Sequence, residues 1–125
     1  MAIISFSHDT IIEYVPSYGG NRDSDEPCIV KMRFVSYAKV MAYSKLIDSK
    51  SKGITDSEKR MEISREIQKQ QFVENVESVS GFLLDGKTII TASEFYDNAP
   101  FALIIEIIRA MEDSAKLSEG QRKNS

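Results

Sequence analysis

The chain has 125 residues, of which 42% are hydrophobic and 28% are charged, and its formal net charge is −3. This length and composition are typical of one globular domain and exclude a disordered chain. A slightly acidic chain lacks the basic surface that nucleic acids require, so we expect no nucleic-acid partner. The longest apolar stretch, residues 99–105, is too short to span a membrane. A single cysteine, together with an N-terminus that does not resemble a signal peptide, favours a cytoplasmic protein.

The N-terminal quarter of the chain alternates short apolar runs with polar breaks. Segments 2–6 and 10–15 are rich in Ile, Phe, Tyr and Val, so we expect two strands there, joined by a turn at residues 7–9. Segment 16–27 contains two glycines, two prolines and several Asp, Asn and Ser residues. Such a composition predicts an exposed loop.

Segment 28–35 shows the clearest strand pattern of the chain. Apolar residues alternate with basic ones, which predicts a half-buried strand. Its inward residues are Val30, Met32 and Phe34, and its outward residues are Lys31 and Arg33. Ser36 can cap a helix over residues 37–49.

The middle of the chain predicts one long helix. Thr55 and Glu58 have the spacing of a capping box, in which each side chain satisfies the backbone N–H of the other residue. Apolar residues three and four apart continue from there, so we expect the helix to run to about Ser80. The apolar stripe consists of Ile63, Ile67, Val73, Val76 and Val79.

The C-terminal part of the chain predicts a hairpin and a last helix. In segment 82–90 the dipeptide Asp85-Gly86 favours a two-residue type I′ turn. A helical turn at residues 93–96 and a helix over residues 98–116 follow, and residues 117–125 form a polar tail. We therefore expect one α+β domain over residues 1–116, in which three helices pack on a small antiparallel sheet. The sheet contains the N-terminal strands, strand 28–35 and the hairpin.

The last helix has apolar residues on two opposite sides at about 100° per residue. The first side is an ordinary core face and contains Phe101, Ile104, Ile105, Ile108, Met111 and Ala115. The opposite side contains Leu103, Ile107, Ala110 and Leu117. Either the rest of the fold covers both sides, or the second side contacts another copy of the chain or a different protein. We predict that Leu103, Ile107, Ala110 and Leu117 bind a partner.

We find no pattern of catalytic or metal-binding residues. His8 is the only histidine, Cys28 is the only cysteine, and the acidic run Asp23, Asp25 and Glu26 lacks the glycine and terminal glutamate of a calcium loop. No glycine-rich phosphate loop follows a strand. We therefore expect no cofactor, no metal and no enzymatic activity.

Several features in order carry a resemblance to a known family. They are a hairpin ending in Asp85-Gly86-Lys87, a short turn (SEFY), a helix (ALIIEIIRAMEDSAKL) and the closing residues LSEGQRKNS. The strand-to-helix passage 29–42 (IVKMRFVSYAKVMA) belongs to the same set. With these features the chain resembles small phage and prophage tail assembly chaperone proteins, some of which end in a similar Leu-Ser-x-x-Glu-x-Lys-Asn-Ser. Gln121 stands where that ending has glutamate.

The resemblance implies a protein that binds the long tape-measure chain during tail morphogenesis and hands it to tail-tube subunits. Its partners would be these tail proteins or a second copy of the chain. The sequence leaves two alternatives open. One is a structural virion component, such as a tail or head completion protein, that forms oligomeric rings. The other is a small enzyme with an unrecognised carboxylate site.

Overall fold

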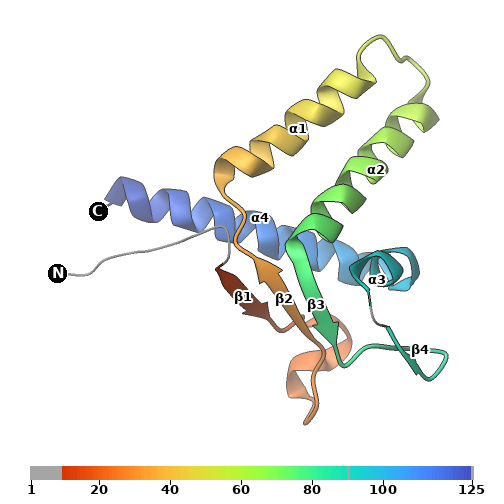
Figure 1. Cartoon of the computed structure of the whole chain (residues 1–125), viewed down its shortest axis with the longest axis vertical. Helices are drawn as coiled ribbons and strands as arrows, with labels where there is room; N and C mark the ends of the chain where they lie inside the picture. The colour runs from red at the N-terminus through yellow and green to blue at the C-terminus, as the bar shows by residue number, and fades with distance from the viewer. Residues whose placement is uncertain (1–9, 90, 125) are drawn as a thin grey trace.

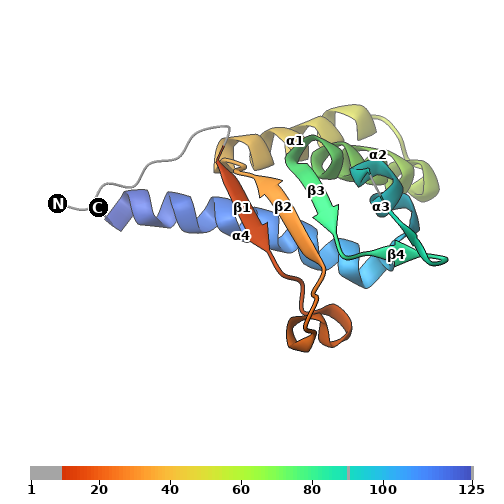
Figure 2. The ribbon, with the colours of Figure 1, turned by 60° about the horizontal axis from the view of Figure 1, so that its bottom comes forward.

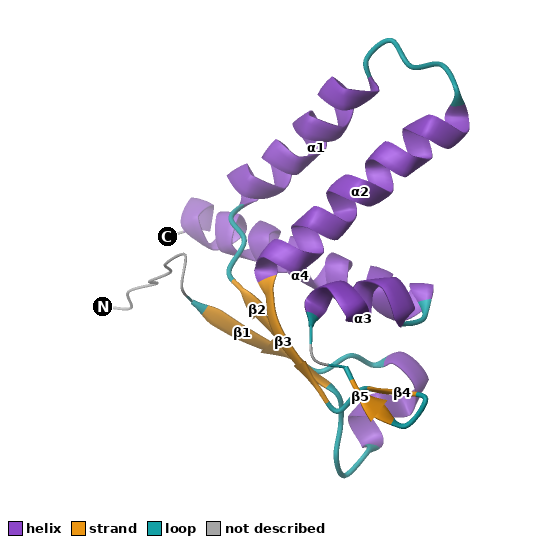
Figure 3. Ribbon diagram, turned by 45° about the vertical axis from the view of Figure 1, so that its right-hand side comes forward, coloured by secondary structure: helices purple, strands orange, loops and turns teal. Residues whose placement is uncertain are grey.

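A computed structural model gives the fold, and it describes residues 10–89 and 91–124, with side chains up to residue 114. The chain is an α+β protein with a three-stranded and a two-stranded antiparallel sheet (Figures 1 and 3). The elements are strand β1 (Ile11–Tyr14), the short 3-10 helix η1 (Tyr18–Asp23), β2 (Ile29–Arg33), helix α1 (Tyr37–Ser51), α2 (Ser57–Asn75), β3 (Val76–Ser80), β4 (Leu83–Leu84), β5 (Lys87–Thr88), α3 (Ala92–Asn98) and α4 (Phe101–Asn124). The predicted strand at residues 2–6 and the turn with His8 lie outside the described residues.

The main sheet has the order β1-β2-β3, and α4 crosses one of its faces (Figure 2). Val30 and Met32 of β2 are buried on that face, whereas Lys31 and Arg33 are exposed on the other. Phe34, just after the strand, is half-buried. The alternation of apolar and basic residues therefore predicted this strand and the inward direction of Val30 and Met32 correctly, because side chains of a strand point to opposite faces in turn. The strand ends at Arg33, however, and the buried residue beyond it is Val35 and not Phe34.

The third strand of the sheet lies where we expected the end of the middle helix. Helix α2 ends at Asn75, and residues 76–80 form β3, in which Val79 pairs with Val30. The helix prediction is wrong over these residues because valines three apart satisfy a helical period, while their β-branched side chains favour a strand that has a partner. The hairpin at Asp85-Gly86 forms as predicted, with positive φ angles of 51° and 76°. It builds the separate β4-β5 sheet and adds no strand to the main one.

Of the three side-chain caps in the described structure, one was predicted correctly from the sequence. Ser36 caps α1 as predicted, with its Oγ accepting from the Lys39 N–H at 3.2 Å. The cap of α2 is Asp56 and not Thr55, because the Asp56 carboxylate accepts from the Glu58 N–H at 2.9 Å. Thr91, which we did not predict, caps α3 through the Glu94 N–H.

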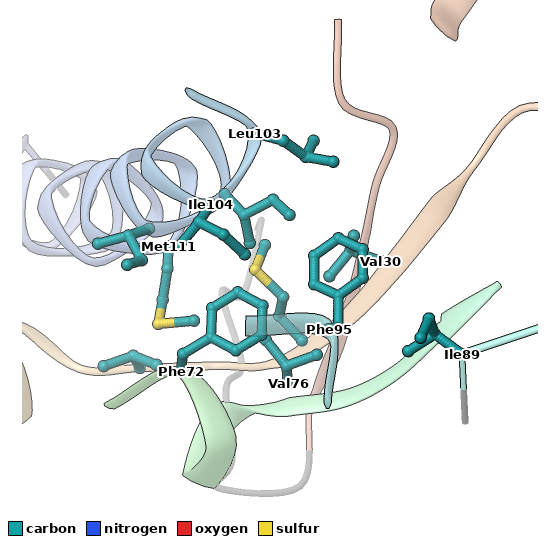
Figure 4. Packing of buried hydrophobic residues seen from close by; sticks show 12 residues of the cluster. Val30, Phe72, Val76, Ile89, Phe95, Leu103, Ile104 and Met111 are labelled. Atoms are coloured by element: carbon teal, nitrogen blue, oxygen red, sulfur yellow. The ribbon is translucent and has the colours of Figure 1, made fainter. Parts of the chain in front are cut away.

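The core lies between the main sheet, α2, α3 and α4. Phe72 of α2 and Phe95 of α3 are fully buried, and their parallel rings stack at 5.9 Å between centroids. Ile104 and Met111 of α4 point toward these rings, and Leu103 belongs to the same buried cluster (Figure 4). Aromatic stacking therefore joins α2 and α3, and α4 closes the core over them.

The buried side of α4 differs from both predicted sides. The buried residues are Leu103, Ile104, Ile107, Ile108 and Met111, and they cover one continuous arc of roughly 140°. Leu103 is only 5% exposed and Ile107 is fully buried. Ala110 is half-buried and packs against the same core. The prediction that these three residues form an uncovered second face is therefore wrong, and the side chain of Leu117 lies outside the described residues.

The other predicted side of α4 is only partly buried. Ile105 is half-buried and Phe101, which we assigned to the core, is 76% exposed. The side of α4 that faces the sheet lies midway between the two predicted sides. A helix that packs on one layer buries only one stripe of side chains, so neither predicted side is buried in full. Helix α4 also continues to Asn124 instead of ending at residue 116.

This assignment of faces is testable by truncating one residue from each side. We expect Ile107→Ala to lower the free energy of unfolding by about 2–5 kcal/mol, because it leaves a cavity in a packed core. Phe101→Ala should change the free energy of unfolding by less than about 0.5 kcal/mol. Urea denaturation followed by circular dichroism measures both. The reverse order of the two effects would show that the faces are assigned incorrectly.

A candidate docking groove on helix α4

A groove of about 680 Å³ runs along the outer side of α4. Tyr14 at the end of β1 forms one wall. The floor and the other wall come from α4 and consist of Phe101, Ala102, Ile105, Glu106, Arg109, Ala110, Asp113 and Ser114. Most of these side chains are apolar or small, so the groove suits an apolar segment of another polypeptide better than a charged small molecule.

The helical repeat explains how the groove arises. Phe101, Ile105, Arg109 and Asp113 are spaced by four residues, so they form one ridge that drifts slowly around the helix. The first two residues of the ridge are apolar and the last two carry opposite charges. The ridge therefore has an apolar end near Pro100 and a charged end further along the helix.

Glu106 attaches the chain after β1 to the border of the groove. Its carboxylate accepts from the Tyr14 hydroxyl at 2.6 Å, from the Ser17 N–H at 2.7 Å and from the Tyr18 N–H at 3.0 Å. The Ser17 hydroxyl donates a further bond at 3.2 Å. Charge-assisted bonds of this kind are shorter and stronger than neutral ones. This contact, which we call the Glu106 latch, fixes Tyr14 as a wall of the groove.

The latch shifts the pKa of both side chains. Burial works to raise the pKa of Glu106, but the bonds from Tyr14, Ser17 and Tyr18 outweigh it and hold the pKa below the ordinary 4.5. Burial, together with the bond to Glu106 and its negative charge, raises the pKa of Tyr14 to about 12. Both shifts stabilise the same state, in which Glu106 is ionised and Tyr14 is a neutral donor. Glu106 thus serves as an acceptor and not as an acid.

The segment that we predicted as an exposed loop is held at several points. Asn21 donates to the carbonyls of Pro16 and Cys28 at 2.8 Å and 3.0 Å and accepts from the Cys28 N–H at 2.7 Å. Arg22 donates to the Val15 carbonyl and lies over the Tyr14 ring at 5.8 Å. Most of segment 16–27 is therefore exposed as predicted, but Pro16 is buried and residues 18–23 form η1 instead of an irregular loop. Hydrogen bonds hold the segment at both ends.

A second polar cluster joins α1 to α2. The Tyr43 hydroxyl donates to the Glu74 carboxylate and accepts from the Asn75 amide at 3.1 Å. Lys39 donates to the same Asn75 side chain at 3.1 Å. The bond from Tyr43 lowers the pKa of Glu74, while burial raises the pKa of Tyr43 to about 12. Every polar atom in this cluster has a partner, so it is a structural contact between two helices.

The predicted site residues do not line an exposed site together. Leu103 and Ile107 are core residues, and of the three predicted residues whose side chains are described, Ala110 alone lines the groove. Sequence reasoning missed Phe101 and Ile105 as surface residues because it assigned them to the core. The available clue was Glu106, since a carboxylate near the middle of the arc opposite Ile104 and Ile108 marks the side away from the sheet.

Cys28 is buried, and burial raises the pKa of its thiol. Among the residues that the structure describes, no three His, Cys, Asp or Glu side chains come close enough to hold a metal ion. None of the described helices has an apolar stretch long enough to cross a lipid bilayer.

Comparison with known proteins gave no match. No protein-family model, no curated protein and no solved structure matches this chain.

The Glu106 latch predicts how stability depends on pH. We expect Glu106→Gln to lower the free energy of unfolding at pH 7 by about 1–3 kcal/mol, because the amide loses bonds made to a charged acceptor. The folded-state pKa of Glu106 lies below its unfolded value near 4.5. Its stabilisation is therefore complete above that value and is lost as the pH falls through the folded-state pKa.

Denaturation curves at several pH values check this prediction. The difference between the original protein and Glu106→Gln should shrink as the pH falls below 4.5. Glu66→Gln is the control. Because Glu66 is exposed on α2, this substitution removes a charge without removing a hydrogen bond. An equal effect of both substitutions would contradict the latch.

Proposed function

We propose that this protein is a non-enzymatic assembly factor that binds phage or prophage tail proteins during morphogenesis, in the manner of a tail assembly chaperone. Its partners would be the tape-measure chain and tail-tube subunits, and it would act in the cytoplasm. The observation that carries the proposal is the apolar groove on α4, in which Phe101 is 76% exposed. The family resemblance of the sequence supplies the biological setting.

The exposure of Phe101 supports a binding role. Fully burying such a side chain is worth about 1.5–3 kcal/mol, and this protein leaves most of it in water at the mouth of an apolar groove. Exposed apolar surface next to a hollow marks sites of protein interaction more often than it occurs by chance. An amphipathic helix or apolar stretch of a tape-measure chain could bury Phe101 and Ile105 in one contact.

The state of the carboxylates supports a function without catalysis. A general acid near neutral pH needs a raised pKa. Among the described carboxylates, the pKa is shifted for Glu74 and Glu106, in both cases downward, and both carboxylates accept hydrogen bonds. Neither is poised to transfer a proton. These bonds hold elements of the fold together instead.

The groove predicts which surface substitutions abolish partner binding. We expect the double variant Phe101→Asp, Ile105→Asp to lose co-purification with a co-expressed phage tape-measure or tail-tube protein. The two carboxylates would place charge where the partner's apolar side chains must pack. The measurement is the amount of tail protein retained by affinity-tagged protein, together with a dissociation constant from calorimetry.

A matched variant controls for added charge. Tyr37 and Met41 are also exposed and four residues apart on a helix, but they lie on α1 away from the groove. Tyr37→Asp, Met41→Asp should leave the complex intact. If the α1 variant failed to retain the tail protein and the α4 variant retained it, the binding surface would lie on α1 and not in the groove. Failure of the original protein to retain either tail protein would refute the proposed function.

A further inference from the structure

The outer ridge of α4 has the symmetry that a pairing between identical helices requires. In a two-fold dimer each residue meets the symmetry-related surface of the other copy, so a self-contact needs complementary groups on one patch. The charged end of the ridge provides them, because Arg109 and Asp113 are one helical turn apart and of opposite sign. Both are exposed, and both line the groove.

Neither charge is paired within the part of the protomer whose side chains the structure describes. The two ion pairs among the described side chains are Lys31–Glu13 and Lys69–Asp97. Arg109 and Asp113 take part in neither, and they form no side-chain hydrogen bond within the part of the chain that the structure describes. An arginine followed by an acid one turn later is also the less favourable order for a pair within a helix. Both charges are thus available to a second molecule.

We propose that a second copy of this chain docks in the groove, with the two α4 helices antiparallel and a two-fold axis at the level of Met111. That position follows from the spacing, because Met111 lies midway between the two charges. Each charge is then about 3 Å along the helix from the axis. Arg109 of each copy meets Asp113 of the other, so the contact forms twice.

The apolar end of the ridge fits the same arrangement. With the axis at Met111, Ile105 lies level with residue 117 of the second copy and Phe101 lies level with residue 121. Helix α4 extends over these residues to Asn124 and projects beyond the main sheet (Figure 2). Burial of Phe101 supplies affinity, and the two charge pairs fix the antiparallel direction.

Charge exchange tests the proposal with the protein alone. We expect the original protein to dimerise reversibly in the micromolar range, measured by sedimentation equilibrium. Arg109→Asp and Asp113→Arg should each weaken the dimer by about tenfold or more, because like charges then face each other twice. The double variant that carries both substitutions restores opposite charges at both contacts. It should return to within about threefold of the original dissociation constant.

Both residues are exposed, so all variants should keep the circular dichroism spectrum and thermal midpoint of the original protein. An original protein that stays monomeric through the high micromolar range would overturn the proposal. So would a dimer that neither single substitution weakens, or one that the exchange does not restore. None of these measurements involves a tail protein, so their outcome is independent of the proposed function.

Discussion

The rest of the molecule depends on how α4 lies against the main sheet. Phe72, Phe95 and the buried side of β2 leave a trough that only one stripe of a helix can fill, and five residues of α4 fill it. A helix packed on one layer buries a single arc, so every side chain outside that arc must face solvent or another molecule. The groove therefore lies on the side of α4 that faces away from the core. Phe101 is exposed because Ile104, Ile107 and Ile108 occupy the trough.

The Glu106 latch sets the rotation of α4 about its own axis. Turning the helix far enough to bury Phe101 would move Glu106 away from Tyr14 and from the N–H groups of Ser17 and Tyr18. Each bond to a charged acceptor is worth about 1.5–3 kcal/mol, so the loss would offset the gain from burying one aromatic ring. The apolar groove therefore persists because a polar contact prevents the helix from closing it. This is a local conflict between burial and hydrogen bonding, and hydrogen bonding prevails.

Local patterns predicted those parts of the fold that depend on neighbours in sequence. The alternation around Val30, the cap at Ser36 and the turn at Asp85-Gly86 are encoded within a few residues, and all three are confirmed. Two features depend on distant partners. Residues 76–80 form a strand because they pair with the edge of β2. The spacing of apolar residues along the sequence does not reveal such a distant partner. The face of α4 depends on the trough that receives it, and a helix with many apolar residues allows several rotations.

The apolar end of the groove would supply binding affinity, and the charged end would set the direction of the bound helix. This division bears on both proposed contacts, the one with a tail protein and the one with a second copy of the chain. Phe101 and Ile105 can pack against any apolar helix, so they favour a tail protein and a second copy of this chain alike. Arg109 and Asp113 discriminate between them, because only a helix with opposite charges in the matching order satisfies both. A tail protein that displaces the second copy must therefore present an acid to Arg109 or bury more apolar surface than α4 does. The same groove cannot hold both occupants, so self-association would keep Phe101 covered until such a partner is synthesised.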